Sequence, residues 1–251
     1  MSVSIVMPMY NASKTIEDAI QSVINQTFSE WELIIVDDSS SDDSVELVKE
    51  IASRESRIKL VTLNENSGSP SKPRNEALKR VNYEFIAFLD ADDLWFPNKL
   101  ARQVDILVRN RNINFLCSGY EVIDNKNNIV GSFLPPPEFG YNDLLKHNSI
   151  GCLTAIFRRE FLGEKSFPKC GHEDYALWLG MTRNGEKIYS IDEKLASYRL
   201  LENSVSSNKF KVGKFFYTIY RYREGFGFFT SMFMMIRYFI FALNKYERNN
   251  G

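Results

Sequence analysis

Residues 85–93 read Phe-Ile-Ala-Phe-Leu-Asp-Ala-Asp-Asp, an apolar run that ends in three carboxylates. A run with almost no polar alternation predicts a strand buried on both faces, as in a parallel sheet. Open α/β sheets bind their ligands at the carboxyl ends of such strands. Clustered carboxylates repel one another, so Asp90, Asp92 and Asp93 favour a hard divalent cation such as Mg²⁺ or Mn²⁺ here. The alternative is that these residues cap a helix near Pro97.

The sequence on both sides of this strand alternates strand and helix patterns. Before it, we expect buried strands over residues 3–7, 31–36 and 58–63, and helices that begin near Ser13, Asp42 and Arg74. This alternation predicts an α/β fold with a Rossmann-like, mostly parallel central sheet flanked by helices. After Leu94 we expect a helix over 97–110, a strand over 115–118, a hairpin over 120–133, a strand over 152–157 and a helix over 173–183.

The composition is that of a globular protein able to bury a core, with 44% hydrophobic and 25% charged residues among 251. The net charge of -1 gives no reason to expect a nucleic-acid partner. The three cysteines lack metal-ligand and redox spacing, and their odd number argues against a disulfide framework. The amino terminus has neither the cationic segment nor the apolar length of a signal peptide, so we expect a cytoplasmic protein.

The last part of the chain differs from the rest in charge. From Ser207 onward eight Lys and Arg residues stand against two Glu residues, a net charge of +6 that leaves -7 for the remainder. The apolar run from Gly225 to Leu243 contains Arg237, which is costly inside a bilayer. We therefore expect amphipathic helices over 206–251 that attach peripherally to the inner face of the cell membrane. The alternative is a helical hairpin that covers the domain or forms a homodimer.

Polar residues also follow the other predicted parallel strands. Tyr10 follows the first strand, and Asp37 and Asp38 follow the second. Because such strand ends meet in one crevice, Tyr10 would offer a flat face to a base, and Asp38 would accept a ring N–H such as that of uracil N3. Lys72 and Arg74 would pair with phosphate or hold the base-binding acid. Each residue also has an ordinary alternative, as a loop aromatic, a helix cap or a surface cation.

A second group of acids begins the helix predicted over 173–183. Glu173 and Asp174 lie at its amino terminus, where the helix dipole favours ionised carboxylates. An ionised Asp174 close to a metal-bound sugar nucleotide can take a proton from an attacking hydroxyl group. The alternative is a pair of charges that only stabilises the helix. His172 offers a ligand or a base, although a single loop histidine more often serves as neither.

Together these stretches resemble the family 2 glycosyltransferases with the GT-A fold, especially bacterial enzymes that build surface polysaccharides. The resemblance covers roughly residues 3–200 and rests on the order and spacing of several stretches. They are residues 3–11, residues 34–42, Pro73-Arg74-Asn75, residues 88–93 and residues 173–178.

The resemblance implies a role for each candidate residue. On the donor side, Tyr10 and Asp38 would hold uracil and Arg74 would brace that pocket. Asp90 would bind the ribose or sugar, and Asp92 would bind the metal, Mn²⁺ or Mg²⁺. On the acceptor side, Asp174 matches the catalytic base of inverting members, and Glu173 would help to position the acceptor. Two more residues of the matched stretches are taken as substrate-binding positions, Pro8 and Trp178.

The sequence departs from the family pattern at two places. Members often carry a histidine shortly after a Tyr-Arg pair, but here Tyr198-Arg199 is followed by two leucines. This departure weakens any assignment of a histidine to the metal. The usual small residues of the third loop are replaced by Ser69-Pro70-Ser71-Lys72-Pro73, which leaves the shape of the donor loop open.

The resemblance implies a metal-dependent inverting hexosyltransferase that moves a sugar from a UDP-sugar to a lipid-linked saccharide in O-antigen or capsule type polysaccharide biosynthesis. It divides the chain into a catalytic domain over 1–205, with a nucleotide-binding half (1–95) and an acceptor-binding half (96–205), and a helical tail over 206–251. Two alternatives are a sugar-1-phosphate nucleotidyltransferase, whose Gly-rich loop this chain lacks after its first strand, and a catalytically silent UDP-sugar-binding membrane scaffold. The sugar, the acceptor and the linkage position do not follow from the sequence.

Overall fold

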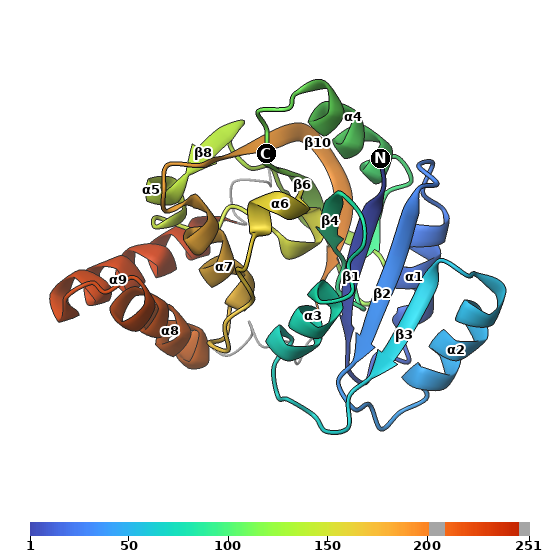
Figure 1. The fold of residues 1–251 in the computed structure, drawn as a ribbon. Helices are drawn as coiled ribbons and strands as arrows, with labels where there is room; N and C mark the ends of the chain where they lie inside the picture. Colours follow the sequence, from blue (N-terminus) through green and yellow to red (C-terminus); the bar gives the residue numbers. More distant parts are fainter. Residues whose placement is uncertain (201–208, 246–251) are drawn as a thin grey trace.

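Within the described residues, 1–200 and 209–245, the computed structural model contains one sheet of ten strands (Figure 1). Half of this sheet is parallel, because β1 pairs in parallel with both β2 and β4, and β2 pairs in parallel with β3. The strands lie in the order β3 (Ile58–Thr62), β2 (Trp31–Asp37), β1 (Val3–Met9) and β4 (Phe85–Phe88). This half confirms the predicted Rossmann-like parallel arrangement.

The other half of the sheet is mixed. Beyond β4 the order continues with β9 (Ile156–Arg158), β6 (Phe115–Ile123), β10 (Lys187–Arg199) and β5 (Leu94–Trp95). Two further strands pair at the side, β7 (Ile129–Phe133) with β6 and β8 (Glu138–Gly140) with β10. The predicted hairpin is confirmed as β6 and β7, except that β6 already begins at Phe115. The 13-residue strand β10 has no counterpart among the sequence predictions.

Alternate residues of the parallel strands face two separate cores. Val3, Ile5 and Met7 of β1 pack with α1 (Ile16–Ile24), α2 (Ser44–Arg54) and α4 (Lys99–Arg109), whereas Val6 packs on the opposite side. That side is covered by α3 (Ser71–Leu78), α5 (Tyr141–Leu144), α6 (Arg159–Leu162) and α7 (Glu173–Thr182). Burial on both faces explains why these strands are apolar at nearly every position.

Two predicted elements differ from the structure. The helix expected from Arg74 begins three residues earlier, at Ser71, because a proline such as Pro73 is tolerated in the first helical turn. The strand expected over 152–157 is a 3₁₀ turn, η1 (Cys152–Thr154), followed by the short strand β9. Side chains of the core take the carbonyl groups that a strand would need, since Trp95 Nε1 donates to Leu153 O and Gln103 Nε2 donates to Thr154 O.

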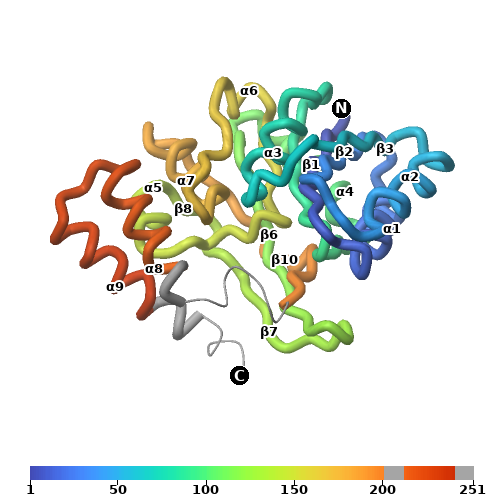
Figure 2. Tube along the Cα trace, turned by 90° about the horizontal axis from the view of Figure 1, so that it is seen from below, coloured from blue at the N-terminus to red at the C-terminus, as the bar shows by residue number. Residues whose placement is uncertain are grey.

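The described part of the tail is helical, as predicted. It consists of α8 (Lys209–Thr218), a π-helical turn η3 (Ile219–Arg223) and α9 (Phe228–Lys245). Figures 1 and 2 both show this hairpin at the end of the molecule remote from β3 and α2. Three residues are fully buried against the core that lies on the α7 side of the sheet, namely Phe216, Ile219 and Tyr220. The hairpin therefore covers the domain through α8 and η3. Among the described residues, no helix has the length and apolar character needed to span a bilayer.

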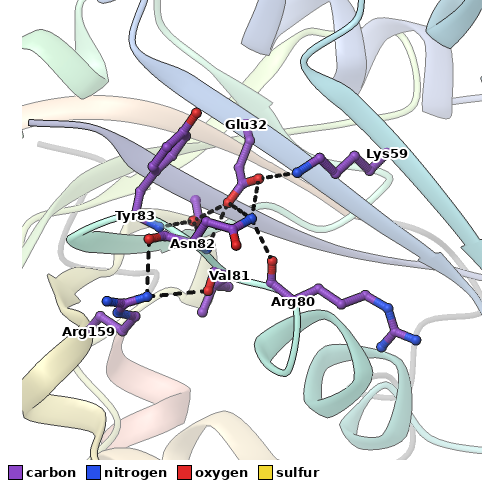
Figure 3. Close-up of polar contacts among 8 residues, drawn as sticks. Glu32, Lys59, Arg80, Val81, Asn82, Tyr83 and Arg159 are labelled. Atoms are coloured by element: carbon purple, nitrogen blue, oxygen red, sulfur yellow. Dashed lines mark hydrogen bonds and ion pairs between the residues drawn. The ribbon is translucent and has the colours of Figure 1, made fainter.

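A polar cluster fixes the strands at the sheet edge opposite the predicted crevice (Figure 3). Glu32 of β2, with a side chain only 4% exposed, accepts from Ser4 Oγ (2.7 Å), Lys59 Nζ (2.6 Å) and the Asn82 backbone (2.9 Å). The backbone N–H of Tyr83 donates to Ser4 Oγ (3.1 Å). The cluster therefore holds the chain segment that leads into β4, the strand that precedes Asp90.

Candidate active site

The loops that follow β1 and β2 are tied together around an exposed aromatic ring. The Asn11 backbone donates to Ser40 Oγ (2.9 Å), and Asn11 Oδ1 accepts from the Ser41 backbone (2.8 Å). Asn11 has a positive φ of 47°, a conformation that asparagine tolerates better than most residues. Tyr10, just beyond the end of β1, remains 53% exposed. Its ring is thus free to stack on a planar ligand, as the sequence predicts.

Asp38 joins its own loop to the loop after β3 and to the end of β1, and it lies almost entirely below the surface. Its side chain accepts from the Ser67 backbone (3.0 and 3.1 Å) and from Ser67 Oγ (2.8 Å), and its own N–H donates to Met9 O (2.8 Å). A carboxylate offers about four acceptor positions, so capacity remains for a ring N–H. Pro8, predicted at the substrate, is instead buried inside β1 opposite Val36, and it presents no side chain to a ligand.

The three carboxylates after β4 have different surroundings. Asp90 Oδ1 accepts from Arg74 Nη2 (2.6 Å), and the buried Asp93 accepts from the Arg199 backbone (2.9 Å). Asp92 is partly exposed, and Arg199 binds its backbone carbonyl rather than its carboxylate. Burial, together with the charge of Asp90, raises the pKa of Asp92 to about 6. This turn is therefore built with one carboxylate that a cation would stabilise.

The donor set around Asp92 is compatible with Mg²⁺ or Mn²⁺ supported by a substrate. Among the residues described, no three His, Cys, Asp or Glu side chains form a ready-made metal cluster. Mg²⁺ usually keeps several waters and takes one or two carboxylates plus substrate phosphates, rather than a complete protein cage. One available carboxylate beside a diphosphate meets that requirement, and Asp92 is the residue that would provide it.

Arg74 links the Asp90 turn to the amino terminus of α7. Its guanidinium is 5% exposed and forms ion pairs with Asp90 (2.6 Å) and with Glu173. Attraction by these carboxylates outweighs the effect of burial, so the pKa of Arg74 lies well above its usual value. The expectation that Arg74 braces the uracil pocket is not met, because α3 directs this side chain into the interior and its ion pairs are with Asp90 and Glu173 rather than Asp38. Arg74 also lies over the Phe167 ring, at 5.3 Å.

The two acids at the start of α7 have different surroundings. Glu173 is 5% exposed and its carboxylate is engaged by Arg74, so it holds α7 rather than facing an acceptor. Burial raises the pKa of Glu173, and attraction to Arg74 offsets only part of that effect. Asp174 is partly exposed. Because one Arg74 side chain contacts both Asp90 and Glu173, the segments that carry Asp92 and Asp174 lie close to one another.

Trp178 is wrongly predicted as a substrate contact. It is fully buried, and its ring packs edge-on against a set of aromatic side chains, Phe88, Phe115, Phe157 and Phe167. The residue lies one helical turn beyond Asp174, which carries it away from the helix terminus and into the core. Trp178 supports α7 from beneath the site.

Arg199 is a site residue that the sequence reasoning did not assign. Its Nε donates to Asp92 O (2.9 Å), its backbone donates to Asp93 Oδ1 (2.9 Å), and its Nη1 donates to Asn127 Oδ1 (2.7 Å). Arg199 therefore holds the Asp90–Asp93 turn in place and joins this turn to the β6–β7 hairpin. The Tyr198-Arg199 pair was visible in the sequence, but nothing in the chain order showed that the end of β10 reaches this turn.

Comparison with known proteins gives a family and close relatives. Residues 4–164 match the family described as Glycosyl transferase family 2. The UDP-Glc:alpha-D-GlcNAc-diphosphoundecaprenol beta-1,3-glucosyltransferase WfgD of Escherichia coli is 46% identical over 210 residues, covering 83% of this chain and 81% of the relative. WfaP, which carries the same enzyme description and also comes from Escherichia coli, is 38% identical over 209 residues, with coverage of 83% and 81%.

Solved structures share the fold at lower identity. S. aureus TarS 1–349 in complex with UDP-GlcNAc has a TM-score of 0.71 at 24% identity, over 87% of this chain and 65% of that one. The mannosyltransferase PcManGT from Pyrobaculum calidifontis, in complex with GDP-Man and Mn²⁺, has a TM-score of 0.70 at 19% identity. The match with PcManGT covers 90% of this chain and 64% of PcManGT, so this chain spans less than two thirds of either solved structure. These similarities confirm the predicted GT-A fold.

Proposed function

The chain belongs to glycosyl transferase family 2, and on that basis we propose that it transfers a sugar from a UDP-sugar to a lipid-linked saccharide with inversion at the anomeric carbon. The observation that carries the proposal is the convergence of the Asp90–Asp93 turn and the α7 amino terminus on Arg74. The convergence supports a single site in which Asp92 would bind a cation and Asp174 would remove a proton.

The residues of the chain suggest how the donor is held. The exposed Tyr10 ring stacks on the uracil, and Asp38 accepts the uracil N3–H from the floor of the pocket. Asp90, oriented by its ion pair with Arg74, lies where it can accept hydroxyl groups of the ribose or sugar. Asp92 would hold Mg²⁺ or Mn²⁺, which neutralises the charge that develops on the departing diphosphate.

Asp174 acts as the base on the acceptor. It accepts the proton of the acceptor hydroxyl as that oxygen attacks the anomeric carbon, opposite the leaving UDP. Attack from the opposite face converts an α-linked donor into a β-linked product. Relatives described as beta-1,3-glucosyltransferases acting from UDP-Glc on GlcNAc-diphosphoundecaprenol support this stereochemistry, the UDP donor and a lipid-linked acceptor.

A membrane-bound acceptor agrees with the outer face of α9. Its exposed apolar side chains follow one another at helical spacing and comprise Phe229, Phe233, Ile236 and Ile240. Arg221 and Arg223 precede the helix and supply positive charge. We infer that this face lies in the cytoplasmic membrane interface beside anionic lipids, which brings the site to its lipid-linked substrate.

Release of UDP tests the proposal. UDP-glucose and UDP-GlcNAc are each incubated with a GlcNAc-diphospho-lipid acceptor in Mn²⁺, in Mg²⁺ or in EDTA. We expect UDP release that requires the acceptor, is lost in EDTA and returns when Mn²⁺ is restored. Undiminished turnover in EDTA would remove the metal from the mechanism. Donor binding without turnover on any acceptor would indicate a silent scaffold, and pyrophosphate release from UTP and a sugar 1-phosphate would indicate a nucleotidyltransferase.

A matched pair of variants tests whether metal binding needs the Asp92 carboxylate itself or is equally sensitive to the loss of any surface carboxylate. Asp92→Asn removes the available carboxylate of the turn, whereas Asp105→Asn changes a solvent-exposed carboxylate of α4. We expect Asp92→Asn to lower turnover and weaken Mn²⁺ binding in the presence of UDP, and Asp105→Asn to leave both unchanged.

A further inference from the structure

The bend immediately before Asp174 has an unusual backbone. Gly171 and His172 both have positive φ angles, 61° and 49°, and α7 begins at the next residue. This left-handed conformation is uncommon in residues other than glycine, although histidine adopts it more often than most of them. The two residues set the direction in which the amino terminus of α7, and with it Asp174, enters the site.

The contacts that hold this bend come from α8 in the carboxy-terminal hairpin. A Cβ atom at Gly171 would lie 2.6 Å from carbon atoms of the Phe215 ring, so this ring occupies the space that any other residue at 171 would need. The His172 ring packs on Phe216 with a centroid distance of 4.9 Å and on Phe215 at 6.0 Å. His172 Nε2 is buried and has no hydrogen-bond partner among the described residues, so ring packing rather than a polar bond fixes this side chain.

Helix α8 and the turn η3 that follows it also contact the first turn of α7. The Tyr175 ring lies 5.3 Å from Phe216, and Tyr175 Oη and Tyr220 Oη are 3.0 Å apart. Phe216 is in turn stacked on Tyr238 of α9, with the centroids 3.6 Å apart. Contact between the bend and the hairpin is therefore continuous from His172 through α8 to α9.

We propose that Phe215 and Phe216 are positioning residues for catalysis, which fix the Gly171–His172 bend and so aim Asp174 at the acceptor hydroxyl. The inference rests on the proposed role of Asp174. It makes the carboxy-terminal hairpin part of the catalytic apparatus as well as a candidate membrane attachment. The donor-binding loops after β1 and β2 belong to the other half of the sheet, so the effect should fall on turnover and leave donor affinity unchanged.

Two glycines of the same segment provide the central test. Gly171→Ala drives a methyl group into the Phe215 ring at a positive φ, whereas Gly180→Ala within α7 meets nothing within 4 Å. We expect Gly171→Ala to reduce kcat by about 10- to 100-fold, the scale of an approximately 1 Å misplacement of a reacting group. The Kd for UDP, measured by titration calorimetry with Mn²⁺, should stay within about twofold in both variants, and Gly180→Ala should keep wild-type kcat.

The Phe215→Ala variant provides a second test of the positioning role. It removes the ring that supports the bend, and we expect a loss of kcat with unchanged UDP affinity. In the Phe215→Ala background, adding Gly171→Ala should lower kcat by a smaller factor than it does in the wild type, because the methyl group now has room.

Wild-type kcat in Phe215→Ala, while Asp174→Asn is inactive, would overturn the positioning role and leave the proposed function standing. An equal loss of kcat and UDP affinity would also overturn it, since that result indicates general disruption. Full activity of Asp174→Asn would instead refute the proposed function itself.

Discussion

Arg74 lies between two carboxylates that come from different parts of the chain. Asp90 follows β4 and Glu173 begins α7, and the guanidinium binds both while being 5% exposed. Only arginine offers a planar fork that reaches two partners at once. This side chain therefore assembles the site by charge, in a position where unpaired charge is expensive.

Replacing Arg74 tests that role. Arg74→Met leaves Asp90 and Glu173 facing one another without a cation, and we expect it to lower the free energy of unfolding by about 3–5 kcal/mol. Arg74→Lys retains one ion pair, so its free energy of unfolding should fall by less. Urea unfolding followed by tryptophan fluorescence gives the values, with Arg80→Met as the exposed control that should change little. Equal stability of Arg74→Met and Arg80→Met would contradict the account.

The sequence predicted the site well where residues follow strands, and less well where they lie on helices. Tyr10, Asp38 and Asp92 were located because the carboxyl ends of parallel strands share one edge. Trp178 was misplaced because a motif match does not tell how far along a helix the site ends and the core begins. The partners of Arg74 could not be predicted either, since the direction of α3 depends on where that helix begins.

At the scale of elements, side chains of β1, β2 and β3 are joined to one another and to the segment that leads into β4, at the edge opposite the site (Figure 3). Burial of Glu32 raises its pKa, but hydrogen bonds from Lys59, Ser4 and Asn82 outweigh that effect, and the pKa ends below the usual 4.5. A carboxylate with a lowered pKa in the folded state stabilises the protein above its unfolded pKa, and this stability is lost as the pH falls through the folded value.

Glu32→Gln is expected to remove this contribution. At pH 7 it should lower the free energy of unfolding by about 1–2 kcal/mol, because a charged hydrogen-bond acceptor is replaced by a neutral one. The difference between variant and wild type should shrink as the pH falls below about 4. Chemical denaturation at pH 7, 5 and 3.5 measures it, with the exposed Glu46→Gln as control. A difference that grows toward low pH would contradict the assigned sign.

The elements themselves were predicted unevenly, for physical reasons. The buried strands of the parallel half are short apolar runs, and their pattern identified them. The long strand β10 alternates and carries charged residues such as Glu193 and Lys194, with irregular pairing around them, so no apolar run marked it. At η1, the tertiary bonds from Trp95 and Gln103 decide the backbone, and no local pattern contains them.

At the scale of the whole molecule, the hairpin of α8 and α9 presents two different faces. One face is buried on α7, whereas Phe229 of α9 is 85% exposed. The two expectations drawn from the sequence for this tail, a membrane attachment and a covering hairpin, thus apply to opposite sides of one structure. The covering side is observed, and the membrane side stays a prediction.

Vesicle binding tests the outer face. The full chain should sediment with vesicles of phosphatidylethanolamine and phosphatidylglycerol, and a Phe229→Ser, Phe233→Ser, Ile236→Ser variant should bind at least about tenfold more weakly. Ile129→Ser with Val130→Ser removes exposed apolar side chains from β7 and should bind like the wild type. Equal binding by the triple variant would contradict the assignment. So would wild-type protein that forms a dimer through this face and ignores the vesicles, as measured by analytical ultracentrifugation.

Turnover by Asp174→Asn is the most direct measurement of the central claim, that the turn after β4 and the amino terminus of α7 form one catalytic site. The substitution keeps the shape of the side chain and removes its ability to take a proton, while Asp192→Asn on β10 serves as an exposed control. We predict that Asp174→Asn lowers kcat by about 10²- to 10⁴-fold with UDP affinity within about twofold of wild type. Wild-type turnover in Asp174→Asn would contradict the account.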